Sequence, residues 1–152
     1  MGNIEIKPAS IQDFEEIYKI ELECFGREAY SRTVYRWLLT DRKTIFLKLV
    51  DSKGTILGFA AGRCERLHGE TVGKVYTLNI RRAFRGRGFA RKLMEALEEE
   101  FRRRGCRKSV LQVAVDNEPA VNLYLKLGYR ITHRLPNYYG PGRDGYEAEK
   151  AL

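Results

Sequence analysis

The amino-acid sequence predicts a mixed α/β fold, with antiparallel hairpins in the first half and a strand–helix–strand crossover in the second. Three observations lead to this prediction. Runs rich in β-branched and aromatic residues, such as residues 44–50 and 75–80, are typical of strands. Apolar residues recur at helical spacing after residue 89. Short turn sequences separate consecutive strand runs, which indicates hairpins.

The expected elements are bounded by helix caps, glycines and turns. Strands are expected over residues 3–7, 44–50, 55–66, 75–80, 109–115, 129–135 and 145–150. Helices are expected after Ser10, which forms a capping box with Asp13, after Ser31 and Asn117, and after the glycine-rich segment 85–90. In the helix after Asn117, the residues expected to face inward are Ala120, Val121, Leu123, Tyr124 and Leu127.

The bulk composition predicts one small domain over residues 1–152 with a heavily charged surface. The formal charge of +8 favours an acidic partner, such as a nucleotide-bearing cofactor, a nucleic acid or the ribosome. No membrane span and no signal peptide are expected. Because Cys24, Cys64 and Cys106 are odd in number and widely spaced, we expect reduced core thiols in a cytoplasmic protein.

The segment 85–90 has the properties of an anion-binding loop. Gly86 and Gly88 remove Cβ atoms where backbone N–H groups could close around an anion, and a helix begins directly after them. Arg85 and Arg87 add donors that suit phosphate. No Lys-Ser/Thr pair follows, and a third glycine is missing, so neither a P-loop nor a dinucleotide fingerprint is present. A merely solvated turn is the alternative interpretation.

A second motif lies after one further helix and strand. Its residues are Asn117, Ala120, Leu123, Tyr124, Gly128 and Tyr129. Together with the Arg-x-x-Gly-x-Ala pattern of the loop, in this order, it resembles the GNAT acetyltransferases over essentially the whole chain.

The resemblance implies a central, mostly antiparallel, splayed sheet flanked by helices, with acetyl-CoA in the opening between residues 76–80 and 109–115. No metal is expected, and the number and spacing of the cysteines do not suggest a zinc site. The residues that the resemblance assigns to cofactor binding are Leu78, Asn79 and Ile80 for the pantetheine arm, Arg85, Gly86, Arg87, Gly88, Phe89 and Ala90 for the pyrophosphate, and Asn117.

The reaction implied by the resemblance is direct transfer of an acetyl group to an amine. Tyr124 matches the family's tyrosine that protonates the departing thiolate. Backbone N–H groups near Leu78 or Asn79 would stabilise the developing oxyanion. Without the surrounding motif, Tyr124 would be interpreted as an ordinary aromatic residue in the core.

The closing segment 137–146 is similar to that of the protein N-terminal acetyltransferases, including the ribosomal-protein-alanine and archaeal types. This resemblance implies that Tyr138 and Tyr139 line the acceptor groove. The other wall is the loop 25–31. The resemblance implies that Phe25 and Tyr30 bind the substrate there and that the carboxylate of Glu28 assists deprotonation of the amine.

Two departures from these relatives concern the general base. Gln112 stands where the ribosomal-alanine branch has a glutamate, and an amide cannot take a proton. The loop 25–31 also lacks the Pro-Trp of many bacterial members. Of the two histidines, His68 is expected in a distant hairpin and His133 on the last strands, both more often structural than catalytic.

Three alternatives stay open at this point. The acceptor could be a small-molecule amine, such as a polyamine or an aminoglycoside. The chain could be a basic RNA- or ribosome-binding module, as the arginines at 81–82 and 102–104 suggest, although no aromatic-basic platform for bases is visible. It could also depend on an auxiliary subunit that anchors it to the ribosome. No membrane and no sequence-specific nucleic acid is expected as a partner.

Overall fold

The computed structural model describes residues 3–152, which form two compact units. Unit 1 contains residues 3–63 and 76–100, and unit 2 contains residues 64–75 and 101–152. Each unit is described by itself. The expectation of a single domain over residues 1–152 stays a prediction, and its first two residues lie outside the described part.

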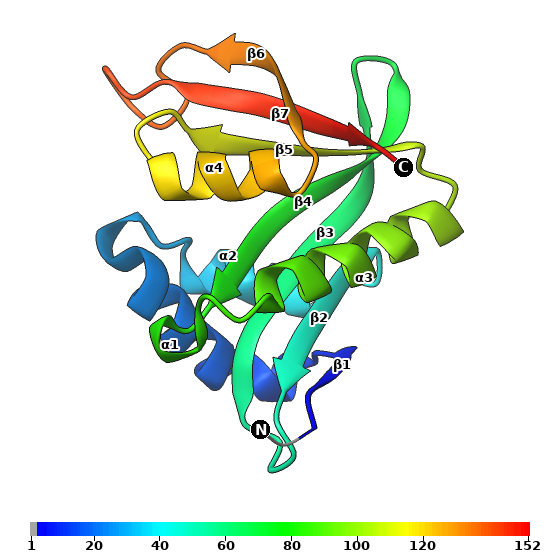
Figure 1. The fold of residues 1–152 in the computed structure, drawn as a ribbon, viewed down its shortest axis with the longest axis vertical. Helices are drawn as coiled ribbons and strands as arrows, with labels where there is room; N and C mark the ends of the chain where they lie inside the picture. The colour runs from blue at the N-terminus through cyan, green and yellow to red at the C-terminus, as the bar shows by residue number, and fades with distance from the viewer. Residues whose placement is uncertain (1–2) are drawn as a thin grey trace. The chain divides into compact units, whose positions relative to one another are not determined.

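The element order confirms the predicted mixed α/β class (Figure 1). The strands are β1 (Glu5–Pro8), β2 (Thr44–Val50), β3 (Ile56–Leu67), β4 (Glu70–Ile80), β5 (Lys108–Ala114), β6 (Arg130–Leu135) and β7 (Gly145–Ala151). The α-helices are α1 (Phe14–Phe25), α2 (Arg32–Thr40), α3 (Phe89–Arg103) and α4 (Glu118–Lys126). Single 3-10 turns cover Ile11–Asp13, Gly26–Glu28 and Arg82–Phe84. The strand order is β1-β2-β3-β4-β5-β7-β6.

The helices begin at the predicted caps. The backbone N–H of Ser10 donates to the Asp13 carboxylate at 2.9 Å, and the Ser31 hydroxyl accepts from the N–H of Val34 at 3.2 Å. Asn117 caps α4 by accepting from the N–H of Ala120 at 3.3 Å. These bonds satisfy N–H groups that a helix start otherwise leaves without acceptors.

In unit 1, α1 and α2 pack their apolar residues against one face of the β2–β3 pair. The core of this unit includes Ile17, Tyr35, Leu38, Phe46 and Phe59, all buried. Figure 1 shows α3 crossing on the other side of the strands from α2. Burial on both faces explains why β2 and β3 read as nearly continuous apolar runs.

In unit 2, β5 lies between β4 and β7. Its pairing with β4 is parallel and consists of Gly73↔Ser109 and Lys74↔Val110, whereas its pairing with β7 is antiparallel and covers the whole strand. Within the described residues, the parallel register therefore covers only the beginning of β4. This agrees with a sheet whose pairing stops before residues 76–80.

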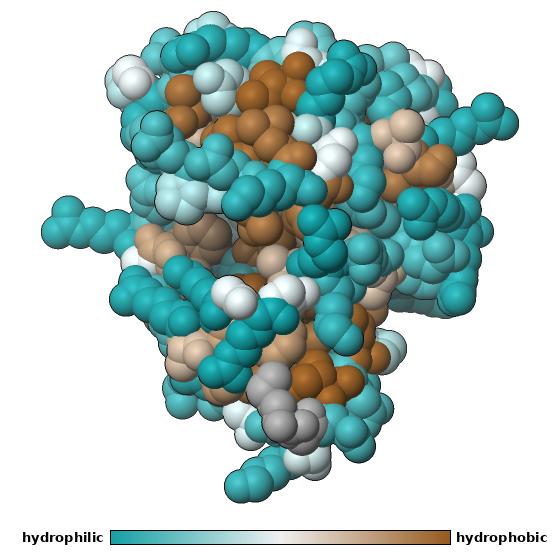
Figure 2. Space-filling model, viewed as in Figure 1, coloured by the Kyte–Doolittle hydropathy of each residue, from teal (hydrophilic) through white to brown (hydrophobic). Residues whose placement is uncertain are grey.

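Helix α4 lies along β5 in unit 2 (Figure 1) and is less buried than predicted. Of the five residues expected to face inward, only Leu127 is buried, and the other four are half-buried. The 3.6-residue pattern located the apolar face but carries no information on what covers it. Figure 2 shows apolar residues gathered over α4 and β5–β7 on an otherwise mostly hydrophilic face.

The three cysteines are free thiols. Cys106 is buried, and its Sγ lies 2.7 Å from that of Cys64, which is half-buried, as is Cys24. Burial and the neighbouring thiol raise the pKa of Cys106 to about 12. Within residues 3–152, no helix is long and apolar enough to cross a membrane.

Candidate active site

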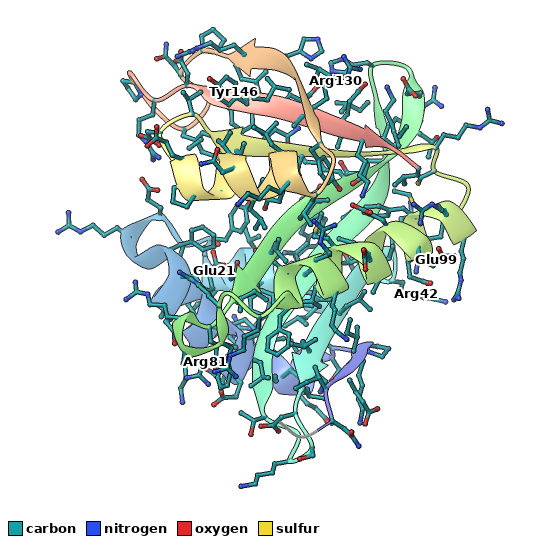
Figure 3. The ribbon with its side chains drawn as sticks, in the orientation of Figure 1. Glu21, Arg42, Arg81, Glu99, Arg130 and Tyr146 are labelled. Carbon is teal, nitrogen blue, oxygen red and sulfur yellow. The ribbon has the colours of Figure 1, made fainter. Side chains whose placement is uncertain are left out.

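A buried glutamate organises the polar part of unit 1. Glu21 comes from α1 and points toward β4 (Figure 3), and its side chain accepts hydrogen bonds from three elements. The Tyr35 hydroxyl donates to Oε1 at 2.5 Å, the Asn79 amide donates to Oε1 at 2.7 Å, and the N–H of Tyr30 donates to Oε2 at 2.9 Å. One carboxylate thus holds α1, α2, β4 and the loop 25–31 together.

The same network extends to Thr77. The Thr77 hydroxyl lies 3.1 Å from the Tyr35 hydroxyl and donates to the Asn79 Oδ1 at 3.2 Å. Burial, followed by the charge of Glu21, raises the pKa of Tyr35 well above its usual value. Asn79 was predicted to bind the cofactor, but its side-chain amide is hydrogen-bonded to Thr77 and Glu21. The predicted contact with the cofactor would therefore be made by its backbone.

The loop 25–31 presents two aromatic side chains to solvent. Phe25 is 39% exposed and Tyr30 is 43% exposed. The Tyr30 hydroxyl donates to the backbone oxygen of Tyr76 at 3.3 Å, and the Tyr30 carbonyl accepts from Tyr18 at 2.8 Å. Glu28 is exposed at the end of the 3-10 turn. Tyr30 is thus fixed at both its backbone and its hydroxyl.

The predicted anion loop has the backbone that such a site requires. Gly86 and Gly88 have φ values of +79° and +81°, and an added Cβ at either position would meet nothing within 4 Å. The carbonyl of Gly88 accepts from the N–H of Lys92, so α3 starts at this glycine. The first N–H groups of a helix have no acceptor within it. This backbone is compatible with the predicted phosphate role, which stays a prediction.

The two arginines of the loop make contacts within unit 1. The Arg85 Nε donates to the Ile80 carbonyl at 2.9 Å, and its Nη2 donates to the Cys24 sulfur at 3.3 Å. Burial raises the pKa of the Cys24 thiol, and Arg85 partly offsets this increase. The Arg87 guanidinium lies 5.3 Å from the centre of the Phe84 ring. Arg85 therefore links the loop to the end of β4, a contact that the sequence did not predict.

In unit 2, Tyr124 lies on α4 with its ring 5.9 Å from that of Tyr129, in an edge-on arrangement. The Tyr129 hydroxyl is 2.7 Å from the Ser109 hydroxyl in the interior. Tyr124 is half-buried rather than sealed in the core. The side-chain oxygen of Asn117 caps the helix. The predicted contact of Asn117 with the cofactor would therefore be made by its side-chain nitrogen.

The segment between β6 and β7 presents the tyrosine pair. Tyr138 is 50% exposed and Tyr139 is 38% exposed, with ring centres 5.0 Å apart. The Asp144 carboxylate accepts from the N–H of Asn137 and from Arg134, which closes the turn. A Cβ on Gly145 would lie 2.9 Å from the Tyr139 ring, so only glycine allows this packing.

A second buried glutamate lies on β7. Glu147 pairs with Gln112 across β5–β7, and its Oε1 accepts from the Gln112 amide at 3.1 Å. Its Oε2 lies 3.1 Å from His68 Nε2 and 3.4 Å from His133 Nδ1. His68 lies in the turn of the hairpin between β3 and β4, as predicted. The contact of this turn with Glu147 on β7 was not predicted.

Burial raises the pKa of Tyr138, and the charge of Glu147 adds to the increase. The Glu147 carboxylate is therefore close to one of the two predicted acceptor tyrosines.

Neither Glu21 nor Glu147 was predicted as a site residue. Glu21 falls on the apolar face of a helix, one turn after Ile17, and a charged residue in that position is the signal that was available. Glu147 lies in a strand that alternates irregularly, and its partners come from two other strands, so no local pattern marks it.

Comparison with known proteins identifies the family of the chain. Residues 11–129 match the model of the acetyltransferase (GNAT) family. The chain is 30% identical to N-alpha-acetyltransferase 30 of Schizosaccharomyces pombe, over 94% of this chain and 95% of the relative. It is 29% identical to the N-terminal acetyltransferase A complex catalytic subunit NAA10 of Arabidopsis thaliana, over 97% and 77%.

Among solved structures, a chain of the NatC complex bound to Gag peptide and CoA superposes with a TM-score of 0.82 at 27% identity, over 100% of this chain and 99% of that one. The family model covers most of the chain, including the anion loop and the second motif. The chain therefore belongs to the GNAT acetyltransferase family, and it is an N-acetyltransferase that uses acetyl-CoA.

Proposed function

We propose that this acetyltransferase acts on the N-terminal α-amine of a protein chain. The observation that carries the proposal is the full-length similarity to N-alpha-acetyltransferase 30, which leaves neither chain with a large unmatched region. Two exposed pairs of aromatic residues, one in each unit, support it. Aromatic rings with hydroxyl groups suit a peptide main chain, which needs both apolar contact and hydrogen bonds.

Acetyl-CoA supplies the activated acetyl group. In the proposal, the N–H groups of residues 86–90 hold its pyrophosphate, and the backbone of Leu78, Asn79 and Ile80 pairs with its pantetheine arm. The positive φ values and open surroundings of Gly86 and Gly88 support the first role. The internal bonding of the Asn79 side chain supports a backbone role for residues 78–80.

Tyr124 is proposed to hold the proton that the departing sulfur takes up. Its half-buried position on α4 supports this role, because a hydroxyl sealed in the core could not reach a ligand. Asn117 is proposed to contact the pantetheine region. Glu28 is proposed to help remove a proton from the acceptor amine, and its exposure in the loop 25–31 is compatible with that.

Phe25 and Tyr30 are proposed to bind the acceptor, and the same role is proposed for Tyr138 and Tyr139. All four side chains are more than a third exposed, although apolar and aromatic residues of this size usually lie inside. Such exposure marks contact surfaces. The charge of +8 also disfavours polyamine acceptors, which are cationic.

The setting is proposed to be the cytoplasm, where nascent protein N-termini emerge. Relatives act within named assemblies, such as the NatC complex, so an auxiliary subunit that brings the enzyme to the ribosome is part of the proposal.

The test is a peptide library that varies the first two residues and contains internal lysines. After incubation with acetyl-CoA, tandem mass spectrometry locates each acetyl group. The proposal expects acetylation at α-amines only, with enrichment of particular first residues. Acetylation of internal lysines contradicts it. Unmodified peptides together with acetylation of a small-amine panel would move the acceptor to small molecules.

A further inference from the structure

The two histidines of the chain meet at one buried carboxylate. His68 comes from the turn between β3 and β4, His133 from β6, and Glu147 from β7, all within unit 2. One ligand atom of each lies within 4.8 Å of the other two. Since the sequence contains only two histidines, their convergence from separate strands on the same carboxylate oxygen is a notable juxtaposition.

The distances suit a metal of the zinc type. Glu147 Oε2 lies 3.1 Å from His68 Nε2, a hydrogen-bond distance, and 3.4 Å from His133 Nδ1, which also lies 3.0 Å from the Thr132 hydroxyl. Zinc bonds of about 2.0–2.1 Å in tetrahedral geometry place neighbouring ligand atoms about 3.3 Å apart. Two of the ligand-to-ligand distances therefore match those of such a tetrahedron. To bind the ion, the two imidazole nitrogens, which lie within 4.8 Å of each other, approach, and His133 Nδ1 exchanges its contact with Thr132 for the metal.

The carboxylate is held in place by groups that do not compete for Oε2. The Gln112 amide donates to Oε1 at 3.1 Å, which orients the carboxylate and leaves Oε2 toward the histidines. Hydrogen bonds of this kind to a ligating carboxylate are typical of metal sites. His68 has a φ of +50°, a left-handed conformation that non-glycine residues seldom adopt.

The charge balance also favours a cation. Among the described residues, the side-chain hydrogen-bond and ion-pair partners of Glu147 are Gln112, His68 and His133, and none carries a permanent charge. A buried carboxylate is costly unless it is paired or binds a metal. The imidazoles are 63% and 57% exposed on their side chains, which gives an ion access and leaves room for a coordinated water.

We infer that His68, His133 and Glu147 form a site for one divalent transition-metal ion, with Zn²⁺ as the best match to two imidazoles and a carboxylate. The ion links the β3–β4 turn to β6 and β7, so its binding stabilises unit 2. This site departs from the expectation that the chain holds no metal. It does not depend on the proposed acceptor.

The first test is Zn²⁺ binding to untagged protein, because a histidine tag would supply its own ligands. Competition with a chromophoric chelator measures stoichiometry and affinity. We expect one Zn²⁺ per chain, and at least a tenfold loss of affinity in each of His68→Asn, His133→Asn and Glu147→Gln. Asparagine is chosen at position 68 because it tolerates positive φ. Glu149→Gln, on the same strand face, is the matched control and keeps wild-type affinity.

The thiols of Cys64 and Cys106 are a rival site, since their sulfur atoms are 2.7 Å apart. Cys64→Ser separates the two. Unchanged Zn²⁺ affinity in Cys64→Ser, with loss in the histidine variants, supports the inference. Loss in Cys64→Ser with retention in the double variant His68→Asn/His133→Asn overturns it, as does the absence of any binding at 1:1 stoichiometry.

A structural readout gives a second, independent check. Excess Zn²⁺ is expected to raise the melting temperature of the wild type and of Glu149→Gln, since a ligand that binds only the folded state stabilises it. The same addition is expected to leave His133→Asn unchanged. An equal rise in all variants contradicts the site.

Discussion

Two of the three buried glutamates among residues 3–152, Glu21 and Glu147, have opposite surroundings. Glu21 in unit 1 is enclosed by neutral donors from Tyr35, Asn79 and Tyr30, and each of its oxygens is engaged. Glu147 in unit 2 accepts from Gln112 at one oxygen, while the other lies at hydrogen-bond distance from His68 and 3.4 Å from His133, and both imidazoles are exposed. The side chains that donate to Glu21 are closed off from solvent, whereas the imidazoles near Glu147 are accessible. Burial of a charge alone therefore does not reveal its role.

The largest expected effect comes from opening the closed network. Glu21→Ala leaves the buried Tyr35 hydroxyl, the Asn79 amide and the Tyr30 N–H without an acceptor, and should cost about 3 kcal/mol of unfolding free energy. Glu21→Gln keeps one acceptor oxygen and should cost less. Urea denaturation measures both. Equal stability of Glu21→Ala and the wild type would show that this network does not hold unit 1 together.

The next effect concerns chemistry rather than stability. Tyr124→Phe should lower kcat by about 100-fold, the low end for loss of a general acid, while the Kd for acetyl-CoA changes little. Tyr129→Phe is the matched control, because its hydroxyl bonds Ser109 inside unit 2 and has no proposed catalytic role. Steady-state kinetics and calorimetry provide the two numbers. An unchanged kcat in Tyr124→Phe would remove this tyrosine from the acid role.

A smaller effect is expected in the anion loop. Gly88→Ala should raise the KM for acetyl-CoA about tenfold, because alanine at a φ of +81° is strained by about 1–2 kcal/mol and reshapes the loop. Gly54→Ala carries similar strain at a φ of +83° in a turn between β2 and β3, also with open surroundings. It should lose similar stability at unchanged KM. Equal KM values in the two variants would contradict the role of the loop.

The smallest effect is a loss of folding stability at low pH, which arises from Asp144 in the segment between β6 and β7. Bonds from the Asn137 N–H and Arg134 lower the pKa of Asp144, so this carboxylate stabilises the folded state above its unfolded pKa of about 3.9 and ceases to do so as the pH falls through its folded value. Asp144→Asn should remove this part of the acid sensitivity below about pH 4. Fluorescence-monitored titration of both proteins measures it, and identical acid transitions would rule it out.

Much of the fold was predictable because its signals are local. Caps at Ser10, Ser31 and Asn117, alternation in the strands and paired turn residues each act within a few positions. The backbone of the segment 85–90 was predictable for the same reason, since its glycines and the helix start are adjacent in sequence.

The contacts between distant segments were not predictable in the same way. The bond of Arg85 to Cys24 depends on how α1 packs beside the end of β4, and the meeting of His68 with Glu147 depends on strand register; no local pattern encodes either. The exposure of α4 also depends on what packs beside it, whereas its sequence pattern shows only which side is apolar. The roles of the predicted site residues remain predictions for the variants above to test.

The most direct test of the central claim uses two peptides of one sequence. One has a free α-amine and a blocked lysine, and the other has a blocked α-amine and a free lysine, so the acceptor amine is the only difference. The account predicts a kcat/KM at least 100-fold higher for the free α-amine, as judged from the acetyl group located by mass spectrometry. Equal rates, or a preference for lysine, would contradict N-terminal acetylation as the function.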